Sequence, residues 1–187
     1  MKVLVATDKP FAPVAVTQIR EVTEKGGHTL ALLEKYKTPQ ELHAAAADAD
    51  AMIVRSDIVD AALIAAAPKL KIVVRAGAGY DNLDLQACTA RNIVAMNTPG
   101  QNSNAVAELA FGMMIYAARG GFDGKTGSEL LGKSLGLHAF GAVGKCMARI
   151  AAGFGMKVYA FDPFVDKKII AESGVTAVNT VEERYSS

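Results

Sequence analysis

The sequence predicts an α/β protein built on parallel sheets. Short β-branched runs alternate with helical patterns from the first residue, and strands and helices repeated in this way form a parallel sheet covered on both faces. A second strand–helix–strand set, with a glycine-rich turn inside it, begins at residue 134. The chain of 187 residues is 51% hydrophobic and 21% charged, so it can bury a real core and is long enough for one large domain or two small ones.

Five strands are predicted in the first half of the chain, each as a short apolar run rich in β-branched residues. They are residues 3–6, 29–33, 51–55, 71–75 and 93–96. The segment between the first two strands has the apolar spacing of a helix, and the glycines at 26–27 suit a left-handed end to it. The apolar face of this helix comprises Phe11, Ala15, Ile19 and Val22.

The middle of the chain is organised by changes in composition. Residues 40–47 are alanine-rich and follow "TPQE", which is a good helix start, whereas residues 97–104 are rich in turn formers and predict a loop. A long apolar helix is expected over about 102–118, with four residues in register: Val106, Leu109, Met113 and Ala117. Residues 118–133 are glycine-rich without periodicity, and we interpret them as an exposed connection between two domains.

The last third of the chain repeats the alternation. We expect a strand at 134–138, a helix from 142 to about 153 and a strand at 157–161. A weak strand at 175–177 precedes a helix start at Thr180.

Charge and composition limit the partners and the location of the protein. Twenty basic residues against nineteen acidic ones leave a net charge of +1, which favours neither a nucleic-acid nor a membrane partner. The N-terminal apolar run is too short for a signal peptide, so we expect a cytoplasmic protein. Cys88 and Cys146 lie far apart without metal-ligand spacing, so we expect no metal site and two small buried thiols.

The stretch "AFGAVG" follows a predicted strand and opens a predicted helix, which is the context of a dinucleotide-binding turn. Gly141 and Gly144 stand where the backbone must approach a pyrophosphate and where helix and strand must pack closely. Ala139 replaces the first glycine, and its methyl is tolerable if φ stays negative there. The amides near Ala142 and Val143 would face the phosphates. The alternative is a plain βαβ unit with glycines for packing.

Asp162 follows Gly141 by 21 residues and ends the next predicted strand. A carboxylate there can accept hydrogen bonds from a ribose diol and would repel the extra phosphate of NADP, which favours NAD as the cofactor. Lys167 and Lys168 lie close by and weaken the argument against NADP slightly. The alternative is that Asp162 is a surface turn residue.

Two further stretches suit a small anion. Arg55 and Ser56 in "VRSD" follow one predicted strand, and the amides of Ala78 and Gly79 in "AGAG" follow the next, at the edge where open α/β sheets hold ligands. Asn102 lies in the loop between the two expected domains and could reach into a cleft there. Taken singly, Arg55 could form a surface ion pair, and the glycine loop could be an ordinary tight turn.

Three stretches together resemble the D-isomer-specific 2-hydroxyacid dehydrogenases: "LKIVVRAGAGYDNLD", "MNTPGQNSNAVAELAFGMM" and "GKSLGLHAFGAVGKCMARIAAGFGMKVYAFDPF". The closest likeness is to members that oxidise D-3-phosphoglycerate in serine biosynthesis. The resemblance implies a flavodoxin-like substrate-binding domain over 1–98, a partial Rossmann NAD-binding domain over 99–187 and a cleft between them. It also implies a homodimer formed through residues 102–131.

The resemblance assigns roles to the candidate residues. The substrate side would comprise Arg55, Ser56, Ala78, Gly79 and Asn102. The NAD side would comprise Val106, Phe140, Gly141, Ala142, Val143, Gly144, Asp162 and Pro163.

The catalytic arginine, glutamate and histidine of this family lie downstream of the nucleotide loop. We therefore expect no catalytic residue among the 187 residues, a truncated chain and no turnover by this chain alone. His28, His43 and His138 do not fit the catalytic position. Two alternatives stay open: a non-catalytic NAD-binding or dimerisation module, and a dehydrogenase for another small 2-hydroxy acid such as glyoxylate or D-lactate.

Overall fold

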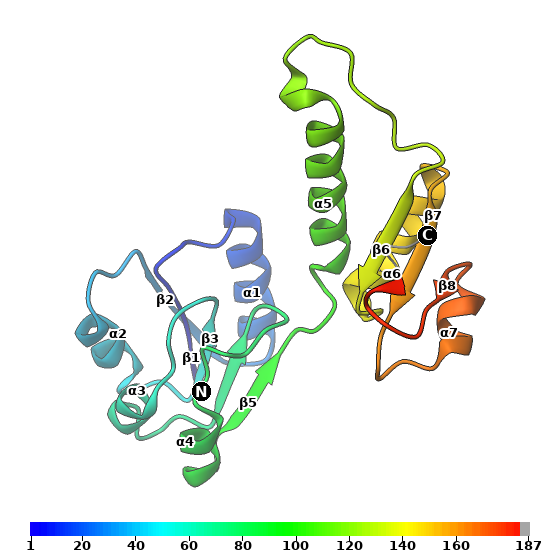
Figure 1. Cartoon of the computed structure of the whole chain (residues 1–187). Helices are drawn as coiled ribbons and strands as arrows, with labels where there is room; N and C mark the ends of the chain where they lie inside the picture. The colour runs from blue at the N-terminus through cyan, green and yellow to red at the C-terminus, as the bar shows by residue number, and fades with distance from the viewer. Residues whose placement is uncertain (184–187) are drawn as a thin grey trace. The chain divides into compact units, whose positions relative to one another are not determined.

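The computed structural model describes residues 1–183. The chain divides into two compact units, Met1–Pro99 and Gly100–Ser187 (Figure 1). The glycine-rich stretch 118–133 therefore lies inside the second unit, and its interpretation as a connection between domains is wrong. It is tied back to the preceding helix, because the amide of Ser128 donates to the carbonyl of Ala118 at 2.8 Å.

The first unit contains a five-stranded parallel sheet of order β2-β1-β3-β4-β5. This is the flavodoxin-like order, in which the strand order reverses between β1 and β3. The α/β class and the parallel sheet are as predicted. The elements are β1 Lys2–Thr7, α1 Pro13–Lys25, β2 Thr29–Glu34, α2 Pro39–Ala46, β3 Ala51–Val54, α3 Ala61–Ala66, β4 Ile72–Arg75, α4 Leu85–Ala90 and β5 Val94–Asn97.

The core of the first unit lies between the sheet and helices α2, α3 and α4. Met52 and Val54 of β3 and Val73 of β4 are fully buried there, together with Leu63 of α3. Burying side chains of this size contributes roughly 1.5–3 kcal/mol each relative to exposure. The apolar content that predicted these strands is thus explained by burial between a sheet and its helices.

Helix α1 lies beside Ile53, whose side chain alternates to the other face of the sheet. Its predicted apolar face is only partly correct, because Val22 is 74% exposed and the buried residue is Thr23. The Thr23 hydroxyl donates to the carbonyl of Ile19 at 2.7 Å, which satisfies it inside the helix. Gly27 follows the helix with φ of +72°, so the left-handed end predicted at 26–27 is confirmed at this residue.

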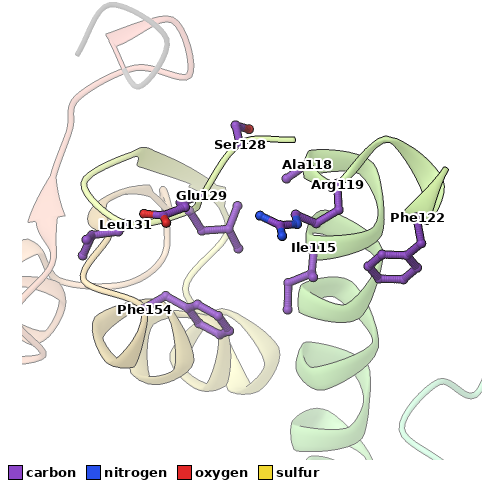
Figure 2. Close-up of a pocket in the computed structure, with 9 residues that line it drawn as sticks. Ile115, Ala118, Arg119, Phe122, Ser128, Glu129, Leu131 and Phe154 are labelled. Carbon is purple, nitrogen blue, oxygen red and sulfur yellow. The ribbon is translucent and has the colours of Figure 1, made fainter. Parts of the chain in front are cut away.

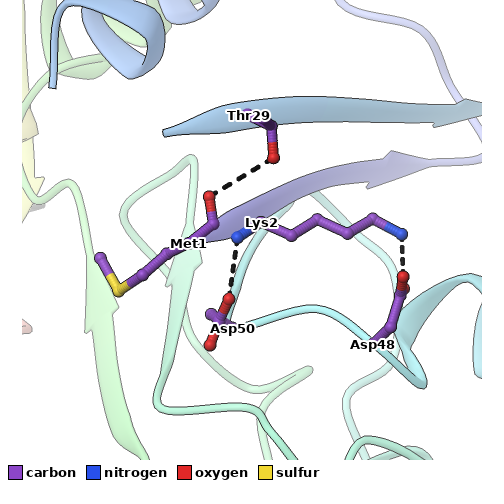
Figure 3. A network of polar contacts seen from close by, with 5 residues as sticks. All are labelled: Met1, Lys2, Thr29, Asp48 and Asp50. Carbon is purple, nitrogen blue, oxygen red and sulfur yellow. Dashed lines mark hydrogen bonds and ion pairs between the residues drawn. The ribbon is translucent and has the colours of Figure 1, made fainter. Parts of the chain in front are cut away.

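The edge of this sheet where β1 begins is closed by polar contacts (Figure 3). The Lys2 amide donates to the Asp50 carboxylate at 2.8 Å, and the Lys2 ammonium pairs with Asp48. The amide of Thr29 donates to the carbonyl of Met1 at 3.0 Å. The hydrogen bond from the Lys2 amide lowers the pKa of the Asp50 carboxyl, with a further contribution from the charge of Lys71. The hydrogen bonds of the Lys2 amide and the Met1 carbonyl continue the pairing of β1 with its neighbours β3 and β2, whereas the Lys2–Asp48 ion pair is exposed.

The second unit contains a three-stranded parallel sheet of order β6-β7-β8. Its strands and helix α6 occur where the sequence predicts them. A short helix, α7, was not predicted. The elements are α5 Ser103–Ala118, the 3-10 turn η1 Gly120–Phe122, β6 Ser134–His138, α6 Ala142–Gly153, β7 Lys157–Phe161, α7 Lys167–Glu172 and β8 Thr176–Ala177.

Helix α5 buries one narrow face and exposes another apolar one. Phe111 belongs to the core of the second unit and stacks on Phe154 with ring centroids 5.2 Å apart. The residues predicted in register lie on the other face, since Leu109 and Met113 are 66% and 65% exposed. This helix therefore presents an unusually apolar surface in the described structure.

Each unit holds one cysteine. Cys88 of α4 is buried as predicted, and burial raises the pKa of its thiol, with a further contribution from the charge of Asp84. Cys146 of α6 is only partly buried, so the expectation of a second buried thiol is wrong. Thr180 lies in a bend and residues 181–182 form a turn, and the rest of the helix predicted from Thr180 lies outside the described residues. Within residues 1–183, no helix is both long and apolar enough to span a membrane.

Candidate functional site

The first unit gathers four of the predicted substrate residues at one edge of its sheet. Arg55 and Ser56 directly follow β3, whereas Ala78 and Gly79 follow the adjacent strand β4. Carboxyl ends of parallel strands meet at the same edge, so these loops are neighbours. Asn102 belongs to the second unit, where it precedes α5.

The Arg55 guanidinium is held by backbone carbonyls. Its Nη1 donates to the carbonyls of Lys9 and Pro10, both at 3.1 Å, and its Cζ lies 5.3 Å from the centroid of the Phe11 ring. No carboxylate among residues 1–183 forms an ion pair with Arg55, so the alternative of a surface ion pair is wrong. The positive charge is oriented by the loop after β1 and is not neutralised there.

Asp57 was not predicted as part of a site. The residue is only 4% exposed, and its carboxylate accepts three hydrogen bonds: from the Tyr36 hydroxyl at 2.6 Å, the Asp8 amide at 2.9 Å and the Arg55 amide at 3.1 Å. Burial raises the pKa of the Tyr36 phenol, and its hydrogen bond to Asp57 raises it further. Asp57 therefore ties together the loops that follow β1, β2 and β3.

Asn82 and Arg75 also hold the loop after β3 from the β4 side. The Asn82 Nδ2 donates to the carbonyls of Asp57 at 2.7 Å and Arg55 at 3.3 Å, and the Arg75 Nε donates to the Arg55 carbonyl at 3.1 Å. Gly77 makes room for this arrangement, because a Cβ there would lie 1.8 Å from the Arg75 Nη1. The sequence signal for Asn82 is its place in "AGAGYDN", the turn-forming stretch after a predicted strand.

The second candidate site is the glycine-rich turn between β6 and α6. Gly141 is the N-cap of α6, and no side chain among the described residues caps the helix. The first amides of a helix have no partner within it, so those of Ala142 and Val143 point outward from its positive end. An anion placed there would receive these hydrogen bonds.

The two glycines of this turn serve different purposes. A Cβ on Gly144 would lie 2.5 Å from the carbonyl oxygen of Ala139, so only glycine allows the helix to pack this closely on the turn. A Cβ on Gly141 would meet no atom within 4 Å. The space over Gly141 is open to a ligand, and it fits the close approach of a dinucleotide pyrophosphate.

The condition placed on Ala139 is not met. Its φ is +96°, whereas a tolerable methyl requires negative φ. Two hydrogen bonds hold the backbone of Ala139 at this positive φ. The Ala139 amide donates to the Phe161 carbonyl at 2.8 Å, and the next amide, that of Phe140, donates to the Asp162 carboxylate at 2.7 Å. Backbone strain is therefore stored at the residue that replaces the first glycine.

Asp162 is engaged within the protein. One oxygen accepts the Phe140 amide and the other accepts the Phe164 amide at 2.8 Å. These backbone hydrogen bonds, that of Phe140 first, lower the pKa of the Asp162 carboxyl, so it is ionised at neutral pH. A carboxylate has about four acceptor sites, which leaves capacity for a diol.

The remaining predicted cofactor residues lie around this unit in different environments. The Phe140 side chain is completely buried in the core, so only its backbone could meet a ligand. Val106 lies on α5 and is 41% exposed, and Pro163 is exposed beside Asp162. Phe164, which was not predicted, is 95% exposed next to them and could provide an apolar surface.

A pocket of about 380 Å³ lies elsewhere in the second unit (Figure 2). Arg119 projects into it from the end of α5, and Phe154 faces it from the end of α6. It was not predicted, because it forms only when the stretch 115–131 folds back on itself and Phe154 of the second unit packs beside it. Among the described residues, no cluster of three metal-binding side chains occurs.

These features define an α/β protein with a flavodoxin-like sheet in one unit and a dinucleotide-type glycine turn in the other. The family model of the D-isomer-specific 2-hydroxyacid dehydrogenase catalytic domain matches residues 4–186. The chain therefore belongs to the D-isomer-specific 2-hydroxyacid dehydrogenases.

Individual relatives agree with this family. D-3-phosphoglycerate dehydrogenase of Methanocaldococcus jannaschii is 38% identical over 160 residues, which is 78% of this chain and 30% of the relative. An NAD⁺-bound 3-phosphoglycerate dehydrogenase of Entamoeba histolytica is 49% identical with a TM-score of 0.89, over 99% of this chain and 59% of that one. The structure of D-lactate dehydrogenase of Escherichia coli is 26% identical in sequence with a TM-score of 0.78, and the match covers 96% of this chain and 60% of that one. The chain thus spans about 30% of the length of the curated relatives it matches.

Proposed function

We propose that this chain provides substrate- and NAD-binding parts of an oxidoreductase that acts on D-3-phosphoglycerate in serine biosynthesis. Relatives named D-3-phosphoglycerate dehydrogenase support this substrate. We further propose that the enzyme is cytoplasmic and homodimeric. That the described chain carries no catalytic residue stays a prediction.

The observation that carries the proposal is the open space over Gly141 at the uncapped start of α6. In this proposal the amides of Ala142 and Val143 bind the pyrophosphate, and the Asp162 carboxylate accepts hydrogen bonds from the ribose diol. Val106, Phe140, Gly144 and Pro163 complete the cofactor side. When bound, NAD would accept a hydride from C2 of the substrate.

Residues 1–98 form the proposed substrate-binding domain and residues 99–187 the proposed NAD-binding domain. In the first of these, positive charge and hydrogen-bond donors would bind the negatively charged groups of the substrate. The Arg55 guanidinium, held over Phe11 without a carboxylate partner in the described chain, offers positive charge to the substrate anion. The Ser56 hydroxyl and the amides of Ala78 and Gly79 add hydrogen bonds in this proposal. Asn102 provides a further one.

Titration calorimetry with NAD⁺ tests the cofactor site through a matched pair of variants. In Gly141→Ala the new methyl meets no protein atom but occupies the proposed cradle, so we expect NAD⁺ affinity to fall at least about tenfold. The melting temperature should fall only slightly, because alanine is a weaker N-cap than glycine. Gly153→Ala adds the same methyl at the far end of the same helix, again in open space, and should bind NAD⁺ normally. Equal binding by wild type and Gly141→Ala would remove the main support for the proposal.

The choice of substrate is tested in the same way. Titration of the NAD⁺-loaded chain with 3-phosphoglycerate, D-lactate and glycolate, the reduced form of glyoxylate, ranks the candidates directly. The likeness to D-lactate dehydrogenase makes D-lactate the competing substrate. We expect 3-phosphoglycerate to bind most tightly. If D-lactate binds more tightly, the proposed substrate is wrong and D-lactate replaces it.

The homodimer proposal is supported by the exposed apolar face of α5 and the segment after it. Large apolar side chains there are more than half exposed: Leu109, Met113, Tyr116, Phe122 and Leu131. Exposed apolar patches of this kind mark interfaces. Sedimentation velocity should show a dimer for the wild type and a monomer for Leu109→Glu, whereas Glu108→Gln, on the neighbouring exposed position, should remain dimeric.

A further inference from the structure

The loop after β3 is held mainly through its backbone. The Arg55 carbonyl accepts hydrogen bonds from Asn82 and Arg75, and the Arg55 amide donates to the Asp57 carboxylate. Between these anchored residues, Ser56 is exposed while Asp57 is buried. The backbone is therefore fixed on both sides of Ser56, whose side chain is exposed.

Asn82 is the central donor in this arrangement. Its two Nδ2 protons reach two carbonyl oxygens, of Arg55 and Asp57, and a carbonyl can only accept. This fixes the orientation of the amide and leaves its Oδ1 buried with no partner in the described chain. A buried acceptor without a hydrogen bond lowers the stability of the folded protein. A role in stability alone therefore does not explain why an asparagine occupies position 82.

We infer that Asn82 is a positioning residue for substrate binding, which acts by holding the Arg55–Asp57 backbone so that the Arg55 guanidinium and the Ser56 hydroxyl face the substrate anion together. This inference rests on the proposed function. The ordering of the loop before binding reduces the entropy lost when the anion binds. Asp57 supports the same loop from the β1 and β2 sides through Asp8 and Tyr36.

Two variants of Asn82 separate hydrogen bonding from packing. Asn82→Ala removes the donor, whereas Asn82→Asp keeps the shape but points an oxygen at two carbonyls. Thr89→Ala is the matched control, because it removes a 2.7 Å side-chain bond to a backbone carbonyl in the same unit, away from residues 55–57. The measurements are calorimetry with 3-phosphoglycerate and with NAD⁺, the melting temperature, and hydrogen exchange at the amides of residues 55–57.

For both Asn82 variants we expect 3-phosphoglycerate affinity to fall on the order of tenfold and amide exchange to rise at residues 55–57, with NAD⁺ affinity unchanged. If Asn82→Asp does not fold, Asn82→Ala still provides the test. Equal 3-phosphoglycerate affinity in wild type and Asn82→Ala would overturn the inference and leave the proposed function standing. No binding of 3-phosphoglycerate by the wild type would overturn both.

Discussion

The two candidate sites are held in shape by different means. At the sheet edge of the first unit, side chains such as Asp57 and Asn82 bind backbone groups of several loops. At the glycine turn of the second unit, the shape depends on missing side chains and on one strained backbone position, Ala139. The first arrangement is sensitive to the loss of a polar group, and the second to the gain of a methyl. The following predictions test that difference, from the largest expected effect to the smallest.

Asp57→Ala should have the largest effect on stability. It leaves the Tyr36 hydroxyl and two backbone amides without their acceptor at a partly buried site, so we expect a loss of about 2–3 kcal/mol in the free energy of unfolding. Urea denaturation measures this loss. Asp48→Ala, which removes an exposed carboxylate from the same unit, is the control and should change little. A similar stability for the two variants would show that the loops do not depend on Asp57.

Gly144→Ala tests the opposite sensitivity in the second unit. Its methyl would lie 2.5 Å from the Ala139 carbonyl oxygen, so the helix must shift away from the turn at a cost of about 2 kcal/mol. The same urea experiment applies, with Gly153→Ala as the control that adds a methyl in open space. We expect only Gly144→Ala to be destabilised. If both variants unfold at the wild-type urea concentration, the close packing of this turn is not required.

Ala139→Gly should stabilise the second unit. Glycine adopts the φ of +96° without strain, although it also gains freedom in the unfolded chain, which leaves a net gain of about 0.5–1 kcal/mol. A rise in the melting temperature measures the gain. Ala142→Gly, three residues later inside the helix, should instead lower it. A decrease for Ala139→Gly would mean that the turn is not strained at this residue.

The two units should respond to opposite ends of the pH scale. The pKa of Asp162 is lowered below its usual 3.8 by the Phe140 and Phe164 amides, so its stabilising contribution is present above pH 3.8 and is lost as pH falls through the lower folded value. The pKa of Tyr36 is raised, so its contribution is present below pH ~10 and is lost at higher pH. Amide chemical shifts of Phe140 and Asp8 should report the two transitions separately. Movement of the Phe140 amide only above pH 3.8 would contradict this assignment.

The regular elements were predictable because their apolar patterns are long or strongly β-branched. Strand β7 and helix α6 agree with the predicted ranges, and the Thr38 side chain caps α2 as "TPQE" suggests. Helices α3, α4 and α7 were missed because six residues contain too little periodicity, although each starts at an aspartate that caps it: Asp60, Asp84 and Asp166. A search for capping aspartates would have found them.

The arrangement of the candidate sites was only partly predictable. The glycine turn is local, so its spacing and the predicted strand and helix on either side of it were enough to locate it. The bonds of Asn82 join residues 25 and 27 positions apart, and such pairs are not visible before the strand order is known. The positive φ of Ala139 was also unexpected, because alanine itself favours negative φ and tertiary hydrogen bonds impose the exception.

The unequal burial of the two cysteines offers a practical route to observing the second unit by itself. A thiol-specific fluorophore should attach to the half-buried Cys146, five positions after Gly141, while the buried Cys88 with its raised pKa reacts slowly. A single dye would then sit on the helix that begins at the glycine turn, with no need to engineer the protein first.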